Sequence, residues 1–86
     1  MLTKQLLFNE VSELIEKINE TDMDASVKYV NEDGMISVEF IHHDKRYPGN
    51  KKEMHLFDFQ NEHNVRAWHF QIDKVMDGGL LDGSTI

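Results

Sequence analysis

The sequence predicts an α+β fold in which an N-terminal helix is followed by a five-stranded antiparallel sheet, strongly bent or closed into an SH3/Sm-like barrel. Apolar residues recur at helical spacing near the N-terminus, and from residue 25 onward they recur at every second position. No second helical pattern offers a crossover between parallel strands, so antiparallel pairing is expected. With 86 residues, the chain is expected to form one domain, 1–86.

The first element is a helix over about residues 4–19. Thr3 precedes it and is suited to cap its first turn, because a hydroxyl oxygen can accept a hydrogen bond from a free backbone N–H. The segment 19–24, Asn-Glu-Thr-Asp-Met-Asp, gathers residues that favour turns, so the helix is expected to end there. The apolar face predicted for this helix comprises Leu7, Val11, Leu14, Ile15 and Ile18.

A β-hairpin is predicted next. The pair Asp33 and Gly34 separates two alternating runs, and glycine readily adopts the positive φ that tight hairpin turns require. The segment 42–52 then interrupts the alternation with Pro48, Gly49 and four bases, which predicts an exposed loop. The alternating apolar residues of the hairpin are Val27, Tyr29, Ile36, Val38 and Phe40.

A second hairpin is predicted from residues 53–60 and 65–72, which also alternate, with residues 61–63 as its loop. A short fifth strand is expected around residues 74–81, so the sheet would span about 25–81 and leave residues 82–86 as a loose tail. The expected cross-strand pairs of the second hairpin are Met54 with Phe70, Leu56 with Trp68, Asp58 with Arg66, and His55 with His69.

The segment Phe70-Gln71-Ile72-Asp73-Lys74-Val75 resembles the closing segment of the WYL domain, an Sm-like small β-barrel of bacterial and phage regulators. His55-Leu56-Phe57 stands where that family has Trp-Tyr-Leu, and Trp68 stands where it has an arginine, with Arg66 one step further along the same face. The resemblance covers about residues 36–82. It implies a barrel and a regulatory sensor that binds a nucleotide or single-stranded nucleic acid near Tyr47, Arg66 and Trp68.

Charge and composition limit the partners. Sixteen acidic against nine basic residues give a net charge of −7, which disfavours general binding to nucleic acid or anionic lipid and favours a basic partner. No apolar run approaches the length needed to cross a bilayer, so no membrane contact is expected. The chain contains no cysteine and no signal-peptide pattern, and a cytoplasmic location is therefore expected.

No pattern indicates an enzyme. The serines lie outside any Gly-x-Ser-x-Gly context, the glycines form no phosphate-binding loop, and Asp58 and Asp73 have nearby bases as structural partners. Five histidines raise the question of zinc, but a structural zinc site needs four ligands. No metal and no cofactor are therefore predicted, and a site formed by His55 and His69 is the weaker alternative.

The leading functional hypothesis is a small, acidic, non-enzymatic interaction module of a regulatory or inhibitor type, of the kind found in phages and mobile elements. Its partner would be a basic protein or a second copy of the chain. The alternative is the WYL-like sensor described above. The acidic residues expected to bind the partner are Glu10, Glu13, Glu16 and Glu20, and Asp22 and Asp24 extend the same stretch.

Overall fold

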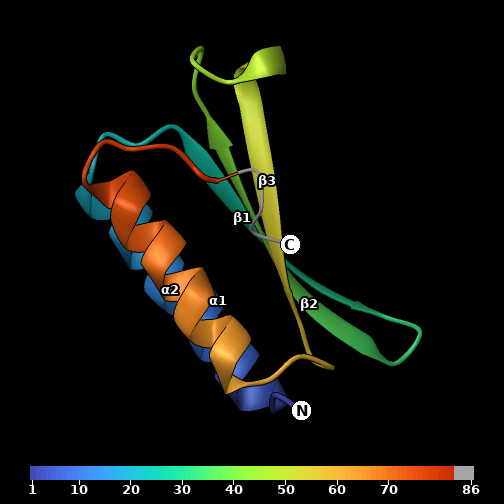
Figure 1. Ribbon diagram of the computed structural model, residues 1–86. Coiled ribbons are helices and arrows are strands. Elements are labelled where there is room, and N and C mark those ends of the chain that lie inside the picture. The colour runs from blue at the N-terminus through green and yellow to red at the C-terminus, as the bar shows by residue number, and fades with distance from the viewer. Residues whose placement is uncertain (83–86) are drawn as a thin grey trace.

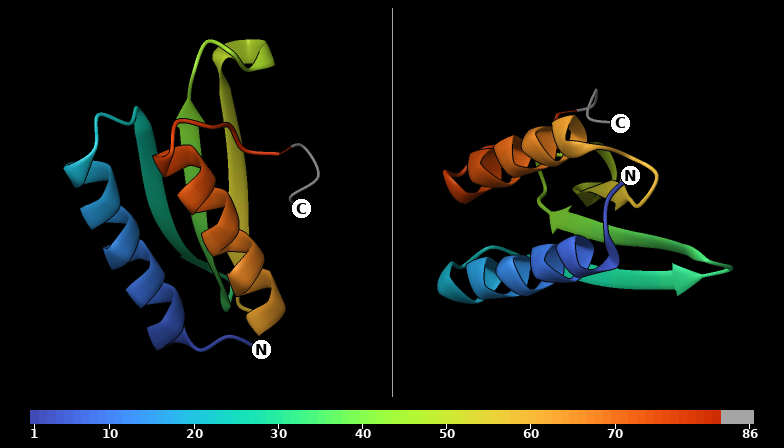
Figure 2. Two further views of the ribbon diagram at one scale, coloured as in Figure 1. Left: turned by 60° about the vertical axis from the view of Figure 1, so that its left-hand side comes forward. Right: turned by 90° about the horizontal axis from the view of Figure 1, so that it is seen from below.

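The computed structural model describes residues 1–82, in which two helices cover one face of an antiparallel sheet. The sheet has three strands in the order β1-β2-β3. Helix α1 lies over β1 and helix α2 over β3, and the two helices run parallel to each other (Figures 1 and 2). The elements are α1 (Lys4–Glu20), β1 (Ala25–Glu32), β2 (Met35–His43), a short 3₁₀ turn η1 (Pro48–Asn50), β3 (Lys51–Phe57) and α2 (Glu62–Met76).

The predicted N-terminal helix is confirmed as α1. The hydroxyl oxygen of Thr3 accepts a hydrogen bond from the backbone N–H of Leu6 at 3.1 Å, so the expected cap is present. Leu7 and Leu14 of the predicted apolar face are buried against the sheet. Ile15, which was assigned to the same face, is instead half exposed.

The first hairpin is also confirmed. Val27 pairs with Phe40 and Tyr29 with Val38 in an antiparallel register. The two-residue turn has positive φ at both positions, 51° at Asp33 and 78° at Gly34. These angles are those of a type I′ turn, which matches the right-handed twist of the flanking strands.

The second predicted hairpin is wrong, because residues 62–76 form helix α2. The apolar residues Trp68 and Ile72 lie four positions apart and both are buried, whereas Phe70 between them is 65% exposed. The three residues alternate as they would in a strand, but Trp68 and Ile72 lie on the buried face of a helix and Phe70 lies on its exposed face. The start of the helix is fixed by a capping box, in which the Asn61 side chain accepts from the backbone of Asn64 and the Asn64 side chain accepts from the backbone of Asn61.

The predicted fifth strand and the barrel are wrong as well. After α2 the backbone N–H of Gly78 bonds to the Val75 carbonyl and that of Gly79 to the Lys74 carbonyl, and φ of Gly78 is 91°. This is a Schellman motif, which ends a helix and leaves no strand over 74–81. The sheet of residues 1–82 is open and three-stranded instead of five-stranded. Residues 83–86 of the predicted tail lie outside the described residues.

The core lies between the helices and the inner face of the sheet. Strand β3 pairs with β2, so that Met54 faces Phe40 and Leu56 faces Val38 across the sheet. Ile72 of α2 packs into the same cluster. Neither α1 nor α2, the two α-helices of the described chain, is long and apolar enough to span a lipid bilayer.

Candidate functional site: an acidic pocket at the carboxyl ends of the helices

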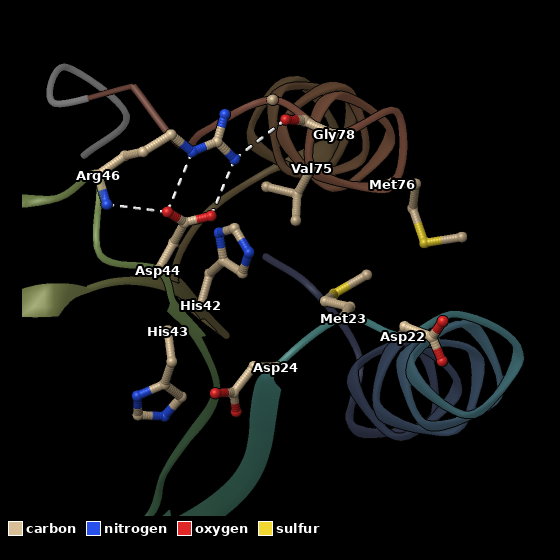
Figure 3. Close-up of a pocket in the computed structure, with 11 residues that line it drawn as sticks. Asp22, Met23, Asp24, His42, His43, Asp44, Arg46, Val75, Met76 and Gly78 are labelled. Carbon is tan, nitrogen blue, oxygen red and sulfur yellow. Dashed lines mark hydrogen bonds and ion pairs between the residues drawn. The ribbon is translucent and has the colours of Figure 1, made fainter.

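A pocket of about 340 Å³ lies where three segments meet: the α1–β1 loop, the end of β2 and the turn after α2 (Figure 3). The loop contributes Asp22, Met23 and Asp24 to its wall. Opposite them lie Met76 and the backbone of Gly78. We refer to this feature as the acidic pocket.

The acidic pocket is electrically negative for two reasons. Asp22 and Asp24 are exposed, and within residues 1–82 neither carboxylate takes part in an ion pair or hydrogen bond. Both helices also end beside the pocket, because they run in the same direction (Figure 1). The aligned peptide dipoles of a helix give its carboxyl end a partial negative charge, so two such ends reinforce the aspartates. The pocket is suited to a cation.

An ion pair between Asp44 and Arg46 forms one wall of the acidic pocket (Figure 3). Arg46 donates from Nε and Nη2 to the two carboxylate oxygens of Asp44, at 3.0 and 2.8 Å. The same Nη2 donates to the backbone carbonyl of Gly78 at 3.1 Å. The hydrogen bonds from Arg46 lower the pKa of Asp44 far below its ordinary value and raise the pKa of Arg46. The pair therefore joins the β2–β3 loop to the end of α2 and stays charged.

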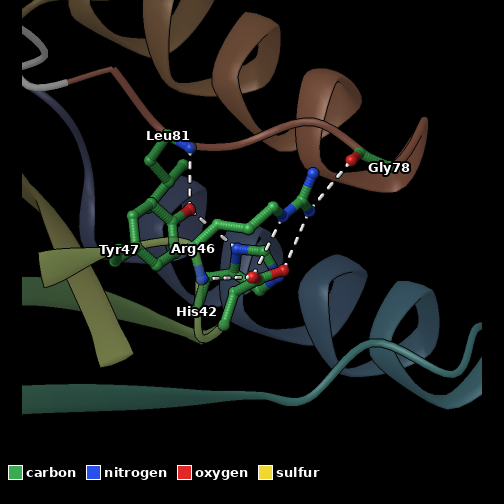
Figure 4. Close-up of polar contacts among 6 residues, drawn as sticks. His42, Arg46, Tyr47, Gly78 and Leu81 are labelled. Carbon is green, nitrogen blue, oxygen red and sulfur yellow. Dashed lines mark hydrogen bonds and ion pairs between the residues drawn. The ribbon is translucent and has the colours of Figure 1, made fainter. Parts of the chain in front are cut away.

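A buried hydrogen-bonded chain lies beneath the pocket. The backbone N–H of Leu81 donates to the Tyr47 hydroxyl at 2.8 Å, and the same hydroxyl lies 2.8 Å from Nδ1 of His42 (Figure 4). Burial lowers the pKa of His42, although the Asp44 and Asp24 carboxylates oppose that shift. Because the Tyr47 hydroxyl already accepts from Leu81, we assign the neutral tautomer of His42 in which Nδ1 accepts a hydrogen bond from that hydroxyl and Nε2 carries the ring proton. Burial also raises the pKa of Tyr47, so the hydroxyl keeps its proton.

The structure separates the four glutamates that the sequence assigned to partner binding. Glu10 is only 7% exposed, and its carboxylate lies 2.6 Å from Nε2 of His69, so it joins the two helices. Glu13 is exposed and forms an ion pair with Lys17 at 3.3 Å. Glu16 and Glu20 are exposed on α1, and Glu20 ends the helix just before the pocket loop.

The three residues of the predicted sensor site lie in different environments. Trp68 is 3% exposed and Tyr47 is 6% exposed, so both belong to the core. Arg66 is exposed near the start of α2, whereas Tyr47 bonds to Leu81 beyond the end of that helix. No common ligand surface brings the three together.

The expected opposition of His55 and His69 is wrong, because His55 lies on β3 and His69 on α2. Each histidine instead approaches two carboxylates whose ligand atoms lie within 4.8 Å of one another and of the imidazole. Each of these two clusters could hold a divalent cation. In the cluster that contains Glu13, however, the ammonium of Lys17 already neutralises that carboxylate. The groups are Glu10, Glu13 and His69, and Glu39, Glu53 and His55.

Sequence reasoning missed the pocket itself. It identified Asp22 and Asp24 as part of an acidic stretch, but it assigned His42 and Arg46 to a solvated basic loop. The available signal was the aspartate two residues before Arg46, a spacing that permits a local ion pair. Comparison with protein-family models, with curated proteins and with solved structures finds no match for this chain.

Proposed function

We propose that this chain is a small, non-enzymatic interaction module that binds a basic protein, and that the acidic pocket receives a lysine or arginine side chain of the partner. The observation that carries this proposal is the position of Asp22 and Asp24, two carboxylates without ion-pair partners in residues 1–82, beside the carboxyl ends of both helices. Exposed Glu16 and Glu20 extend the negative surface along α1 and would attract the partner during approach.

The walls of the pocket fit a long basic side chain. Met23, Val75 and Met76 supply apolar surface for its methylene groups, and thioether side chains adapt readily to a ligand's shape. The carboxylates of Asp22 and Asp24 would receive its cationic end. A volume of about 340 Å³ is at the small end for ligand sites, as expected for one side chain.

Two titratable side chains of the pocket are already engaged, which favours a binding role over catalysis. His42 is held by Tyr47, and Asp44 is held by Arg46, so neither is available as a general base. Among the described residues that line the pocket there is no serine, threonine, cysteine or lysine to act as a nucleophile.

A sensor for nucleotides or single-stranded nucleic acid is less favoured. Two of its three residues, Tyr47 and Trp68, are buried, and base stacking requires an accessible aromatic face. The net charge of −7 also opposes a polyanionic ligand.

The proposal is tested by measuring binding of an arginine-rich peptide by titration calorimetry at several salt concentrations. Replacing Asp22 and Asp24 together by asparagine should weaken binding roughly tenfold and flatten its salt dependence. The matched control is Asp33→Asn with Glu62→Gln, which removes the same charge from the hairpin turn and the start of α2, at the other end of the molecule (Figure 1). Equal losses in both double variants would show attraction to net charge alone and would contradict a pocket-specific site.

A further inference from the structure

A second surface lies on the side of α1 that faces away from α2. The flank toward α2 carries Glu10 and Lys17, which contact His69 and Asp73 of that helix. On the opposite flank, Phe8 is 55% exposed and Ile15 is 52% exposed, although both are large apolar residues. They lie seven positions apart and therefore form a stripe along one side of the helix.

This stripe adjoins the open edge of the sheet. Strand β1 is the edge strand beneath α1 (Figure 2). Phe8 and Tyr29 together line a groove of about 450 Å³, between the first turns of α1 and β1. We call the flank of α1 and the free edge of β1 the edge surface.

The backbone of β1 is ready to pair with a further strand. The carbonyl of Asp24 accepts from the N–H of His43, which shows that even-numbered residues of β1 direct their backbone groups toward β2. Odd-numbered residues, among them Tyr29 and Asn31, therefore direct theirs toward the open edge. The other edge strand, β3, begins with three consecutive charged residues, 51–53, a common protection against strand pairing.

The charges of β1 fit a second copy of the same strand. The strand holds one lysine and one glutamate, so it is neutral although the chain is acidic. In an antiparallel pair centred on Val30, Lys28 of each copy lies opposite Glu32 of the other, so the two-fold axis creates two pairs of opposite charge. The same register places Tyr29 opposite Asn31, whose backbone groups both face the edge. A pair centred on Lys28 would place two lysines opposite each other, which is unfavourable.

We infer that the edge surface is a homodimer interface: two copies of β1 pair antiparallel around a two-fold axis at Val30, which joins the two sheets into one of six strands. The groove lined by Phe8 and Tyr29 closes against the second copy. An isologous contact of this kind needs one self-complementary patch, which the neutral, charge-alternating strand provides. This interface is separate from the acidic pocket and goes beyond the proposed function.

The first test is the mass of the chain in solution, by sedimentation equilibrium and light scattering. The wild type should be dimeric, and Phe8→Glu should be monomeric. Phe70→Glu is the matched control, since Phe70 is 65% exposed but lies on α2, away from the edge surface. Phe70→Glu should stay dimeric. A wild type that remains monomeric up to about 1 mM overturns the proposal.

The second test identifies the register. Lys28→Glu and Glu32→Lys should each be monomeric, because each places like charges opposite each other. The two variants mixed together should form a heterodimer, since every pair is again complementary, and the double variant should recover the homodimer. Circular dichroism confirms that each variant is folded. A dimer that is insensitive to both substitutions, or variants that fail to associate when mixed, would refute the register and the β1 interface with it.

Discussion

The buried hydroxyl of Tyr47 is expected to contribute strongly to stability. It joins three segments of the chain, because it bonds to His42 at the end of β2 and to the backbone of Leu81 after α2. The change Tyr47→Phe keeps the ring in place and removes only the oxygen. It leaves the Leu81 N–H and Nδ1 of His42 without their partner at a position that is 6% exposed.

The size of the effect follows from these two lost hydrogen bonds. A buried polar group that loses its partner costs about 1–3 kcal/mol, so Tyr47→Phe should lower the free energy of unfolding by about 3 kcal/mol. A domain of 86 residues has a total stability of roughly 4–13 kcal/mol. The variant should therefore melt roughly 12–24 °C below the wild type, at about 4–8 °C per kcal/mol for a domain of this size.

Urea unfolding followed by Trp68 fluorescence measures this loss, since Trp68 is the one tryptophan of the sequence and is buried in the core. The control is Tyr29→Phe, because the Tyr29 hydroxyl has no hydrogen bond within residues 1–82, and this change should alter stability by less than about 0.5 kcal/mol. If the two variants were equally stable, the Tyr47 network would have no role in holding the pocket together.

Three further predictions concern α2 and the pocket. Ile72→Ala should cost about 2–5 kcal/mol in urea unfolding and Phe70→Ala well under 1 kcal/mol, whereas equal costs would argue that both residues face the core, as in a strand. Gly78→Ala should lower the free energy of unfolding by about 1–2 kcal/mol because φ of Gly78 is 91°. Gly79→Ala should also destabilise the chain, because the added Cβ would lie 2.9 Å from the Lys74 carbonyl oxygen. Unchanged urea midpoints of unfolding in both variants would contradict the Schellman motif. Stability should fall as the pH drops below about 6.5, because the pKa of His42 is lowered in the folded state and the unfolded chain binds the proton first; His42→Asn should flatten that dependence, and an equally steep profile would assign it to other groups.

The sequence predicted those elements whose signals are local. The cap at Thr3 and the turn at Asp33 and Gly34 each depend on residues next to one another in the chain, and both are present. The periodicity of the N-terminal helix is also a local property, and it placed Leu7 and Leu14 correctly in the core.

The prediction failed where two periods fitted the same residues. Trp68, Phe70 and Ile72 alternate as a strand would, but Trp68, Ile72 and Val75 also follow a helical stripe. The capping residue Asn61 could have decided between them, because its box partner Asn64 follows three positions later. The choice of β2 as the partner of β3 is a non-local property, which the sequence pattern alone did not reveal.

Of the candidate site, only the negative charge was predicted from the sequence. The acidic stretch through Asp22 and Asp24 was identified, but the pocket also needs the turn at Gly78, which lies far along the chain and was assigned to a strand. The alternative sensor hypothesis placed Tyr47 near a bound ligand, whereas in the structure its buried hydroxyl contacts His42 below the pocket.

The acidic pocket and the edge surface should act independently because they occupy opposite ends of β1. Asp24 precedes the strand at the pocket, whereas the inferred two-fold axis passes through Val30, six residues further and therefore about 20 Å away. The monomeric variant Phe8→Glu should then bind an arginine-rich peptide with the same affinity per chain as the wild type. A partner with two basic segments should instead bind the dimer more tightly, because the second contact becomes intramolecular. If Phe8→Glu lost peptide binding while remaining folded, the basic ligand would have to contact α1 near the edge, and the assignment of the pocket as the binding site would be wrong.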